Sequence, residues 1–318
     1  MQLNELQTAQ LKEHWPLKGE FRFHRRVANF VYFVQMHEQE VVLRLTEPHH
    51  RQLDEIHAEM HWMSYLSEQG MKIATPISTN NGEFVLPLEG QQKYYATVIS
   101  KAPGRPMKDE EITRQNLEIY GRYLGKMHRL TKDYSPPKNA LRRQEWRDDE
   151  TLSMALRAHE ISDPIAFQRM NEVLEWLGSL PKTRDSYGLV HCDLHMGNFF
   201  LDGESITAFD FDDSCYQWFS HDLTAPLMSF QYAIQEKKLP VTEKQLLSDF
   251  LVGYAKENSL QQVWIDRISI FQVYRKIVIY HWIKTSIREH AFDEKALAWA
   301  KNKLPKLLLE IEKPIHFF

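Results

Sequence analysis

The sequence predicts an α+β protein whose first part is rich in strands and whose second part is mainly helical. β-Branched and aromatic residues dominate Val27–Met36 and Tyr94–Ser100, a composition typical of strands. Beyond Pro103-Gly104-Arg105-Pro106, which interrupts regular structure, apolar residues recur mostly at helical spacing. This change of pattern divides the chain into a predicted lobe of residues 1–101 and a second lobe of residues 102–318.

Short turns are expected to join strands in the first part. Val41–Leu45 forms a second apolar run, and residues 37–39 separate it from the run that ends at Met36, so a hairpin is predicted. Asn80-Asn81-Gly82 has the composition of a tight turn. It predicts another hairpin, formed by the short runs on either side of it.

Helices are expected before and between these strands and throughout the second part. One covers residues 3–14, and another covers about 49–69, where apolar residues recur at steps of three and four. Gly70 then provides the left-handed residue that ends many helices. A further helix is predicted over about 113–130. Later helices are expected to begin at the capping residues Asp163, Thr242 and Asp293.

Composition excludes several classes of protein. With 43% apolar residues the chain can bury a core, and its 2 cysteines rule out a disulfide framework and favour a reducing compartment. The net charge of −4 argues against a nucleic-acid partner. The polar N-terminus lacks the features of a signal peptide, and no apolar run approaches the roughly 20 residues of a membrane span. A cytoplasmic protein without a membrane partner is expected.

Residues 191–212 hold the concentrated chemistry of the second part. Tyr187–Val190 is predicted to lead in as a short strand, and Phe199–Leu201 and Ile206–Phe209 are predicted to pair around a tight turn at Asp202-Gly203. Asp193, Asn198 and Asp210 are then expected at the same side of this hairpin.

Phosphoryl transfer requires residues of these types. A carboxylate must orient the attacking hydroxyl and accept its proton, which suits Asp193. Oxygen ligands must hold Mg²⁺ against the phosphates of ATP, which suits the carbonyl of Asn198 and the carboxylate of Asp210. Turn formation alone is the competing explanation for these three residues.

The pattern His-x-Asp-x-x-x-x-Asn, followed by an Asp after an apolar strand, resembles the motif of the aminoglycoside phosphotransferase and choline kinase family. The resemblance implies a two-lobed, protein-kinase-like fold with a small β-rich N-lobe and a larger helical C-lobe. It implies that Asp193 is the catalytic base, that His191 braces the catalytic loop, and that Asn198 and Asp210 hold the metal. By the same resemblance Asp222 supports the loop from the next helix.

The resemblance also implies residues that bind the nucleotide. Arg44 occupies the position of the lysine that contacts the phosphates, and Glu59, which lies closer to the apolar stripe of its helix than Glu55, is the expected partner of Arg44. Backbone groups of residues 98–101, including those of Ile99 and Lys101, are expected to contact the adenine. No Gly-x-Gly-x-x-Gly loop precedes Val27, so the phosphate-covering loop departs from the kinase pattern.

The acceptor is expected to be a small hydroxyl compound, and acids near aromatics favour a cationic one, such as an amino alcohol, an aminoglycoside or a homoserine-like molecule. The candidate substrate residues are Asp212, Asp213 and Trp218, with further acids and aromatics in residues 146–150 and 280–282. Ordinary helix starts and core packing explain the same residues equally simply.

Three other functions stay open at this point. A Ser/Thr protein kinase of the same fold differs only in its acceptor. A nucleotide-binding pseudokinase is motivated by Arg44 and the missing glycine loop. A metal-dependent hydrolase requires one metal ion to collect ligands from the set His191, Asp193, His195, Asp210 and His221. The sequence leaves undecided the acceptor, the choice between ATP and GTP, and the oligomeric state.

Overall fold

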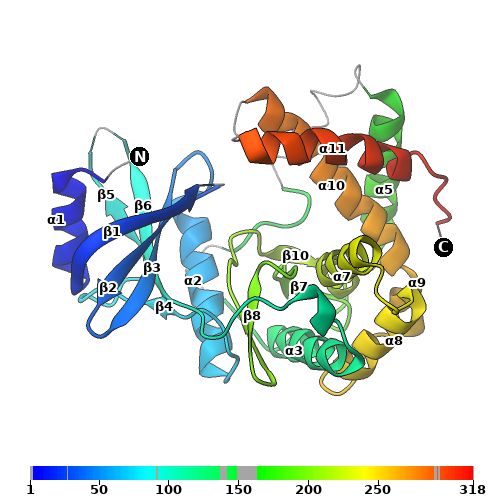
Figure 1. The fold of residues 1–318 in the computed structure, drawn as a ribbon, viewed down its shortest axis with the longest axis horizontal. Coiled ribbons are helices and arrows are strands. Elements are labelled where there is room, and N and C mark those ends of the chain that lie inside the picture. Colours follow the sequence, from blue (N-terminus) through cyan, green and yellow to red (C-terminus); the bar gives the residue numbers. More distant parts are fainter. Residues whose placement is uncertain are drawn as a thin grey trace. The chain divides into compact units, whose positions relative to one another are not determined.

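The computed structural model describes residues 3–26, 28–90, 92–136, 142–148, 163–289, 292 and 294–317, and Figure 1 labels most of its helices and strands. The chain forms two compact units. The first comprises Met1–Lys108, Asp133–Arg143 and Met196–Ser214, and the second comprises Asp109–Lys132, Gln144–His195 and Cys215–Phe318. The lobe boundary predicted after residue 101 stays a prediction.

The first unit is built on an antiparallel sheet. Its order is β1-β2-β3-β6-β4, and β5 also pairs with β6. The turn between β2 and β3 contains His37 in the left-handed conformation (φ 50°), and the predicted hairpin is present. The strands are β1 (Leu17–Arg26), β2 (Phe30–Met36), β3 (Gln39–Thr46), β4 (Pro76–Ile77), β5 (Leu86–Leu88) and β6 (Tyr94–Ser100).

The hairpin predicted around residues 80–82 is wrong in its pairing. The turn itself exists, because Thr79 N–H donates to the carbonyl of Glu83 at 2.7 Å and Gly82 has φ 86°. However, β4 pairs with Val98 and Ile99 of β6, and β5 pairs with an adjacent stretch of the same strand. Turn composition specifies the local reversal of the chain but not the strand that satisfies the flanking backbone.

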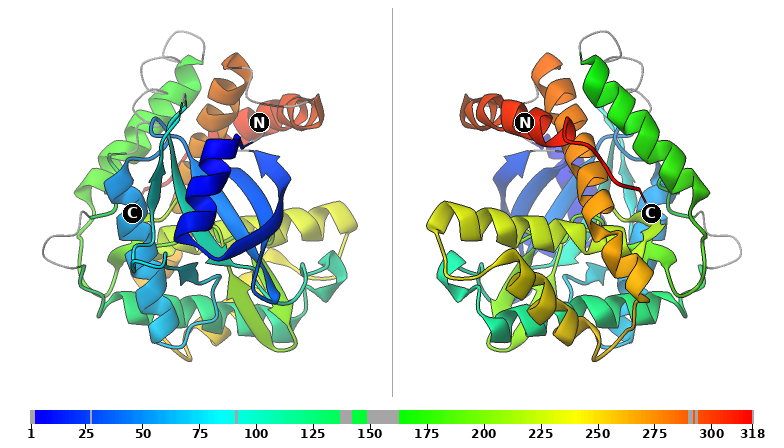
Figure 2. Two further views of the ribbon diagram at one scale, coloured as in Figure 1. Left: turned by 90° about the vertical axis from the view of Figure 1, so that its left-hand side faces the viewer. Right: turned by 90° about the vertical axis from the view of Figure 1, so that its right-hand side faces the viewer.

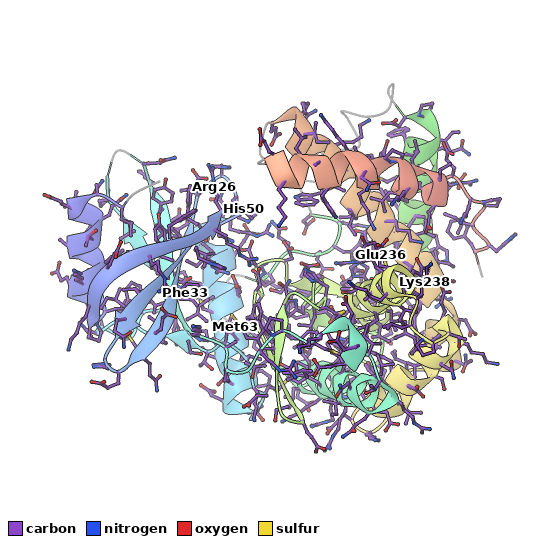
Figure 3. All side chains as sticks on the ribbon, viewed as in Figure 1. Arg26, Phe33, His50, Met63, Glu236 and Lys238 are labelled. Carbon is purple, nitrogen blue, oxygen red and sulfur yellow. The ribbon has the colours of Figure 1, made fainter. Side chains whose placement is uncertain are left out.

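Two helices accompany this sheet. α1 (Glu5–His14) begins with a capping box between Asn4 and Gln7. α2 (Leu53–Glu68) buries the predicted apolar stripe, which includes Met63 (Figure 3), and Gly70 follows it at φ 73°. Both helix predictions are confirmed to within a few residues.

The hairpin of β8 (Phe199–Asp202) and β9 (Ser205–Ala208) belongs to the first unit and was predicted correctly. Two backbone attachments hold it in place. Ala74 N–H donates to the carbonyl of Ala208 at 2.8 Å, and Arg105 N–H donates to the carbonyl of Leu201 at 2.9 Å. Gly104 precedes the second attachment at φ 95°, and a Cβ there would lie 2.3 Å from the Leu201 carbonyl oxygen. The predicted break at residues 103–106 is therefore a tight backbone crossing.

The second unit is mainly helical, as predicted, and α10 packs against α5, α7 and α11 (Figure 2). α3 and α8 approach closely at Gly121, where a Cβ would lie 1.9 Å from the Phe250 carbonyl oxygen. Thr242 caps α8 as predicted, whereas Asp293 lies outside the described residues. The helices are η1 (Asp109–Glu111), α3 (Arg114–Thr131), α5 (Pro164–Ser179), α6 (Phe219–Asp222), α7 (Thr224–Lys237), α8 (Glu243–Tyr254), α9 (Gln262–Asp266), α10 (Ile268–Arg288) and α11 (Glu294–Ile311).

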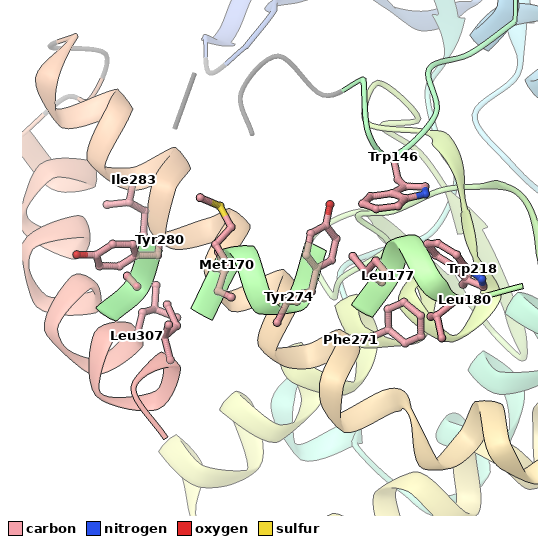
Figure 4. Packing of buried hydrophobic residues seen from close by; sticks show 14 of the residues in the cluster. Trp146, Met170, Leu177, Leu180, Trp218, Phe271, Tyr274, Tyr280, Ile283 and Leu307 are labelled. Atoms are coloured by element: carbon pink, nitrogen blue, oxygen red, sulfur yellow. The ribbon is translucent and has the colours of Figure 1, made fainter. Parts of the chain in front are cut away.

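Side chains from α5, α10 and α11 form a core in this unit that includes Met170, Tyr280 and Leu307 (Figure 4). The strand β7 (Tyr187–Val190) was predicted, but its antiparallel partner β10 (Cys215–Trp218) was not. Within the described part of the chain, every helix is too short or too polar to cross a membrane.

Candidate active site

The loop that follows β7 is anchored from α6. Asp222 accepts hydrogen bonds from the backbone N–H groups of Cys192 at 2.7 Å and of His191 at 3.4 Å. The fully buried His191 ring lies below the loop, and its Nδ1 is 3.4 Å from the N–H of Asp193. Tyr120 donates its hydroxyl to the carbonyl of Leu194. The bracing predicted for His191 and Asp222 therefore agrees with the geometry of the second unit.

A buried polar chain extends behind Asp222. The hydroxyl of Tyr254 accepts a bond from Asn258 at 2.8 Å and also lies 2.8 Å from Nδ1 of His128. Nε2 of His128 then donates to Asp222 at 2.8 Å. Burial by itself raises the pKa of Asp222, but the bonds and charges of His128, with further contributions from the loop, lower it overall. This chain fixes the orientation of the carboxylate that anchors the loop.

Cys192 is a packed thiol, as expected from the sequence. It has a left-handed backbone (φ 65°) and lies in an apolar cluster with Val190 and Phe219. Its Sγ is 3.1 Å from that of Cys215, and both cysteines are free. The left-handed residue turns the chain sharply just before Asp193.

Asp193 is held by a residue that the sequence did not single out. Arg275 of α10 donates Nη1 to the carbonyl of Cys192 at 2.6 Å and Nη2 to Oδ1 of Asp193. His195 Nε2 lies 3.5 Å from Oδ2 of the same carboxylate. Burial by itself raises the pKa of Asp193, but Arg275 and His195 lower it overall, so the carboxylate stays ionised at neutral pH.

Asn198 and Asp210 flank the open end of the β8–β9 hairpin in the first unit. Phe209 N–H donates to the carbonyl of Asn198 at 3.0 Å, which ties the residue before Asp210 to Asn198. Asp210 has a left-handed backbone (φ 67°) and pairs with Arg25 of β1 at 3.1 Å. A carboxylate and an amide carbonyl are hard oxygen donors that suit Mg²⁺ or Ca²⁺. The residues at this end of the hairpin therefore fit a divalent metal by their chemistry.

Arg44 of β3 forms the predicted pair with Glu59 of α2. Nη1 and Nη2 donate to Oε1 and Oε2, each at 2.7 Å, and both side chains are buried. Burial by itself lowers the pKa of Arg44, but Glu59 raises it overall. Glu55 instead accepts a bond from the N–H of Gln52 at the start of α2. The choice of Glu59 over Glu55 as the partner of Arg44 is confirmed.

Asp212 and Asp213 occupy different environments. Asp212 is buried, bonds His50 at 2.7 Å and lies 3.6 Å from Arg51. Burial by itself raises the pKa of Asp212, but His50, Arg51 and Arg44 hold it well below its usual range. Asp213 is 59% exposed and pairs with Arg51 at 3.0 Å. Asp212 thus belongs to a buried ion-pair network of the first unit.

Other basic residues surround this network. Glu47 accepts a bond from Arg26 at 3.1 Å, and its carbonyl accepts one from the N–H of His50 at 2.9 Å, which places Arg26 and His50 at the same end of β1 (Figure 3). The buried Arg143 donates to the carbonyls of Glu55, Asp212 and Ser214.

The predicted adenine-binding segment is the end of β6. Ile99 lies between Val42 of β3 and Pro76 of β4, and its side chain is largely buried. Lys101 follows the strand, pairs with Glu40 at 2.6 Å and lies over the ring of Phe33. These positions agree with the expectation that Ile99 contacts the adenine through its backbone, because its side chain is largely buried.

Trp218 is fully buried and lies against Trp146 and Tyr187 in the core of the second unit (Figure 4). Core packing therefore accounts for Trp218. Tyr280 and His281 are buried on α10 as well. Asp149 and Glu150 lie outside the described residues.

The metal-dependent hydrolase hypothesis required several imidazoles and carboxylates around one ion. Across the ranges that the structure describes, no group of three or more His, Cys, Asp or Glu side chains is placed to hold a metal. His221 instead lies against the ring of Tyr274. Burial, together with nearby Arg275, lowers the pKa of His221 to about 3, so this ring is neutral at physiological pH.

Sequence reasoning missed four functional candidates. The sequence offered one indication of Arg275: Arg275 and Lys276 are adjacent basic residues in a helical stretch that is otherwise mostly apolar. The partners of the others are distant in sequence and could not be inferred from local pattern. The four are Arg25, His128, Arg143 and Arg275.

Comparison with known proteins gives consistent matches. Residues 20–254 match the model of the phosphotransferase enzyme family. The chain is 35% identical over 269 residues to an amicoumacin kinase of Bacillus subtilis (strain 168), which covers 83% of this chain and 79% of that relative.

Two solved structures are similar over most of the chain. An amicoumacin kinase in complex with AMP-PNP, Ca²⁺ and Ami has a TM-score of 0.83 and 30% identity, over 96% of this chain and 92% of that one. A microcompartment-associated aminopropanol kinase has a TM-score of 0.75 at 18% identity, over 96% of both chains, and supports the fold alone. The predicted α+β, protein-kinase-like fold class is confirmed.

Proposed function

Because the chain belongs to the phosphotransferase enzyme family and is an ATP-dependent kinase of a small-molecule hydroxyl, we propose that Asp193, Asn198 and Asp210 carry its reaction. The observation that carries this proposal is the anchoring of the Asp193 loop. Asp222 holds the main chain of this loop, and Arg275 holds the carboxylate. A carboxylate whose main chain and side chain are both held in this way is suited to orient a nucleophile.

In the proposed reaction Asp193 accepts the proton of the acceptor hydroxyl. The hydroxyl oxygen forms a bond to the γ-phosphorus of ATP, the bond from that phosphorus to the bridging oxygen breaks, and ADP leaves. The transition state of such transfers is loose, so positioning contributes more than basicity. A carboxylate with a lowered pKa therefore suits the role.

We assign Asn198 and Asp210 as ligands of Mg²⁺. An ion held by these residues would neutralise negative charge on the phosphates of ATP. Asp210 pairs with Arg25 in this structure, so Arg25 supplies positive charge close to the proposed metal ligand. The nucleotide is proposed to contact Arg44, which Glu59 holds in place, and the main chain at Ile99 and Lys101.

The acceptor is proposed to be amicoumacin or a molecule that shares its phosphorylated group. The support is the 35% identity to an amicoumacin kinase over 83% of this chain. An amino alcohol and homoserine are the next candidates, because the acids near aromatics in the sequence favour a cationic acceptor of this kind. Asp213, which is exposed, is the remaining candidate for contacting a cationic group.

The test is a panel of acceptors incubated with ATP and Mg²⁺. It contains amicoumacin, 1-amino-2-propanol, homoserine, choline, an aminoglycoside and a generic protein substrate. ADP release is followed, and the product is identified by a mass increase of one phosphoryl group. Phosphorylated amicoumacin with a kcat/KM at least about tenfold above the others supports the proposal. A preference for another compound of the panel would identify that compound as the acceptor in place of amicoumacin. Transfer to no compound of the panel would contradict the proposed kinase function.

A further inference from the structure

We propose that Arg275 is a positioning residue that holds one oxygen of Asp193 and so fixes the direction in which this carboxylate meets the hydroxyl of the acceptor. This inference rests on the proposed role of Asp193 as the base. It adds a residue from α10, 82 positions away along the chain.

The first support is the geometry of the two hydrogen bonds that Arg275 donates. One guanidinium spans two consecutive residues, because Nη1 donates to the carbonyl of Cys192 at 2.6 Å and Nη2 donates to Oδ1 of Asp193. The planar fork of arginine offers both donors in a fixed relation, which the single ammonium of lysine cannot do. The main chain and the side chain at the base are therefore fixed together. The Arg275 side chain is 14% exposed, so solvent screens this contact only partly.

The second support is that different residues hold the main chain of the loop and the side chain of Asp193. Asp222 of α6 bonds the backbone of residues 191 and 192, and Tyr120 of α3 bonds the carbonyl of Leu194. These bonds position the main chain but leave rotation about the side-chain bonds of Asp193 to be set by another group. Arg275 contacts that carboxylate directly. Its removal should therefore disturb the base more than the loop.

The third support concerns the carboxylate oxygens. Oδ1 accepts a charge-assisted bond, which draws electron density from it and occupies one of its faces. Oδ2 faces His195, whose Nε2 lies at 3.5 Å, longer than a good hydrogen bond. The two oxygens of Asp193 therefore differ in their surroundings, and His195 marks the side of the carboxylate from which we expect the hydroxyl to approach.

The experiment compares Arg275→Ala and Arg275→Lys with Lys276→Ala in the full chain. Lys276 is the next residue on α10 and pairs with Glu310, so its loss removes a neighbouring charge without touching the Asp193 loop. We expect Arg275→Ala to lower kcat about 100-fold, the scale of a misplaced catalytic group, with KM for ATP within about twofold of the wild-type value. Lys276→Ala should keep the wild-type kcat.

Chemical rescue gives the decisive readout. Guanidinium ion at concentrations well below those that unfold the protein should raise the kcat of Arg275→Ala at least about tenfold, by filling the vacated position. Arg275→Lys should retain an intermediate kcat. Guanidinium should not raise the activity of Asp193→Asn, because the base itself is missing. Circular dichroism of each variant controls for unfolding.

Two results would overturn the inference. One is an unchanged kcat in Arg275→Ala. The other is a loss of activity that neither lysine nor guanidinium restores and that follows a lowered unfolding midpoint, which would make Arg275 a structural residue only. Failure of the proposed function looks different: wild-type protein would transfer to no acceptor, or Asp193→Asn would stay active, whatever the Arg275 variants do.

Discussion

Arg44 and Glu59 form a bidentate ion pair that joins β3 to α2, with both nitrogen–oxygen distances at 2.7 Å. The pair occupies the position where the family resemblance led us to expect a lysine and a glutamate. Arginine preserves the charge and replaces a point contact with two parallel bonds. The pair therefore links the strand and helix of the first unit rigidly.

Removal of either partner should destabilise the protein. Glu59→Gln or Arg44→Met leaves one buried charge without its bidentate partner, and the expected loss of unfolding free energy is about 3–5 kcal/mol. Urea titration followed by circular dichroism measures it. Arg114→Met is the matched control, because its pair with Glu118 is exposed on α3 and should contribute little. Equal effects of the buried and exposed substitutions would contradict this account.

Asp193→Asn should nearly abolish transfer while nucleotide binding persists. Loss of a positioned general base typically lowers kcat by about 10²–10⁴-fold. Asp202→Asn is the control, since Asp202 is an exposed residue of the β8–β9 turn. Single-turnover assays give the rate, and calorimetry gives the ATP affinity. A fully active Asp193→Asn protein would exclude the proposed mechanism.

Asp210→Ala should weaken the binding of ATP in the presence of Mg²⁺ more than in its absence. The reason is that the carboxylate is proposed to hold the metal and not the nucleotide directly. Titration calorimetry with Mg·ATP and with ATP plus a chelator measures the difference, and Asp202→Ala again serves as the control. If both titrations weaken equally, Asp210 is not a metal ligand.

The buried Asp222 should make stability depend on pH in the acid range. Its pKa is lower in the folded chain than in the unfolded chain, so the unfolded state binds more protons as the solution is acidified. The stabilisation is present above the unfolded value of about 3.9 and is lost as the pH falls through the folded value.

Asp222→Asn should therefore lower the unfolding free energy at pH 7, by about 3 kcal/mol, and flatten its decline on acidification. Urea titrations at a series of pH values from 7 down to about 3 test both parts. Asp202→Asn, an exposed change, should follow the wild-type curve. A variant whose acid decline matches that of the wild type would assign the effect to other carboxylates.

The sequence pattern predicted most helices and strands correctly, because these elements depend on the local preferences of their own residues. The run Tyr94–Ser100 became β6 without change, and Thr242 caps α8 as expected. The sequence pattern did not predict which strands pair with each other. β4 and β5 both pair with β6 instead of with each other, and the strand partner of β7 was not foreseen.

The sequence by itself predicted a phosphotransferase, from the types and spacing of Asp193, Asn198 and Asp210 and their resemblance to a family motif. Tertiary structure decided what holds these groups in place. Arg275 reaches Asp193 across 82 positions, and His128 reaches Asp222 across 94. Such contacts depend on the packing of helices that are remote in sequence, and the local preferences of the two residues do not indicate them.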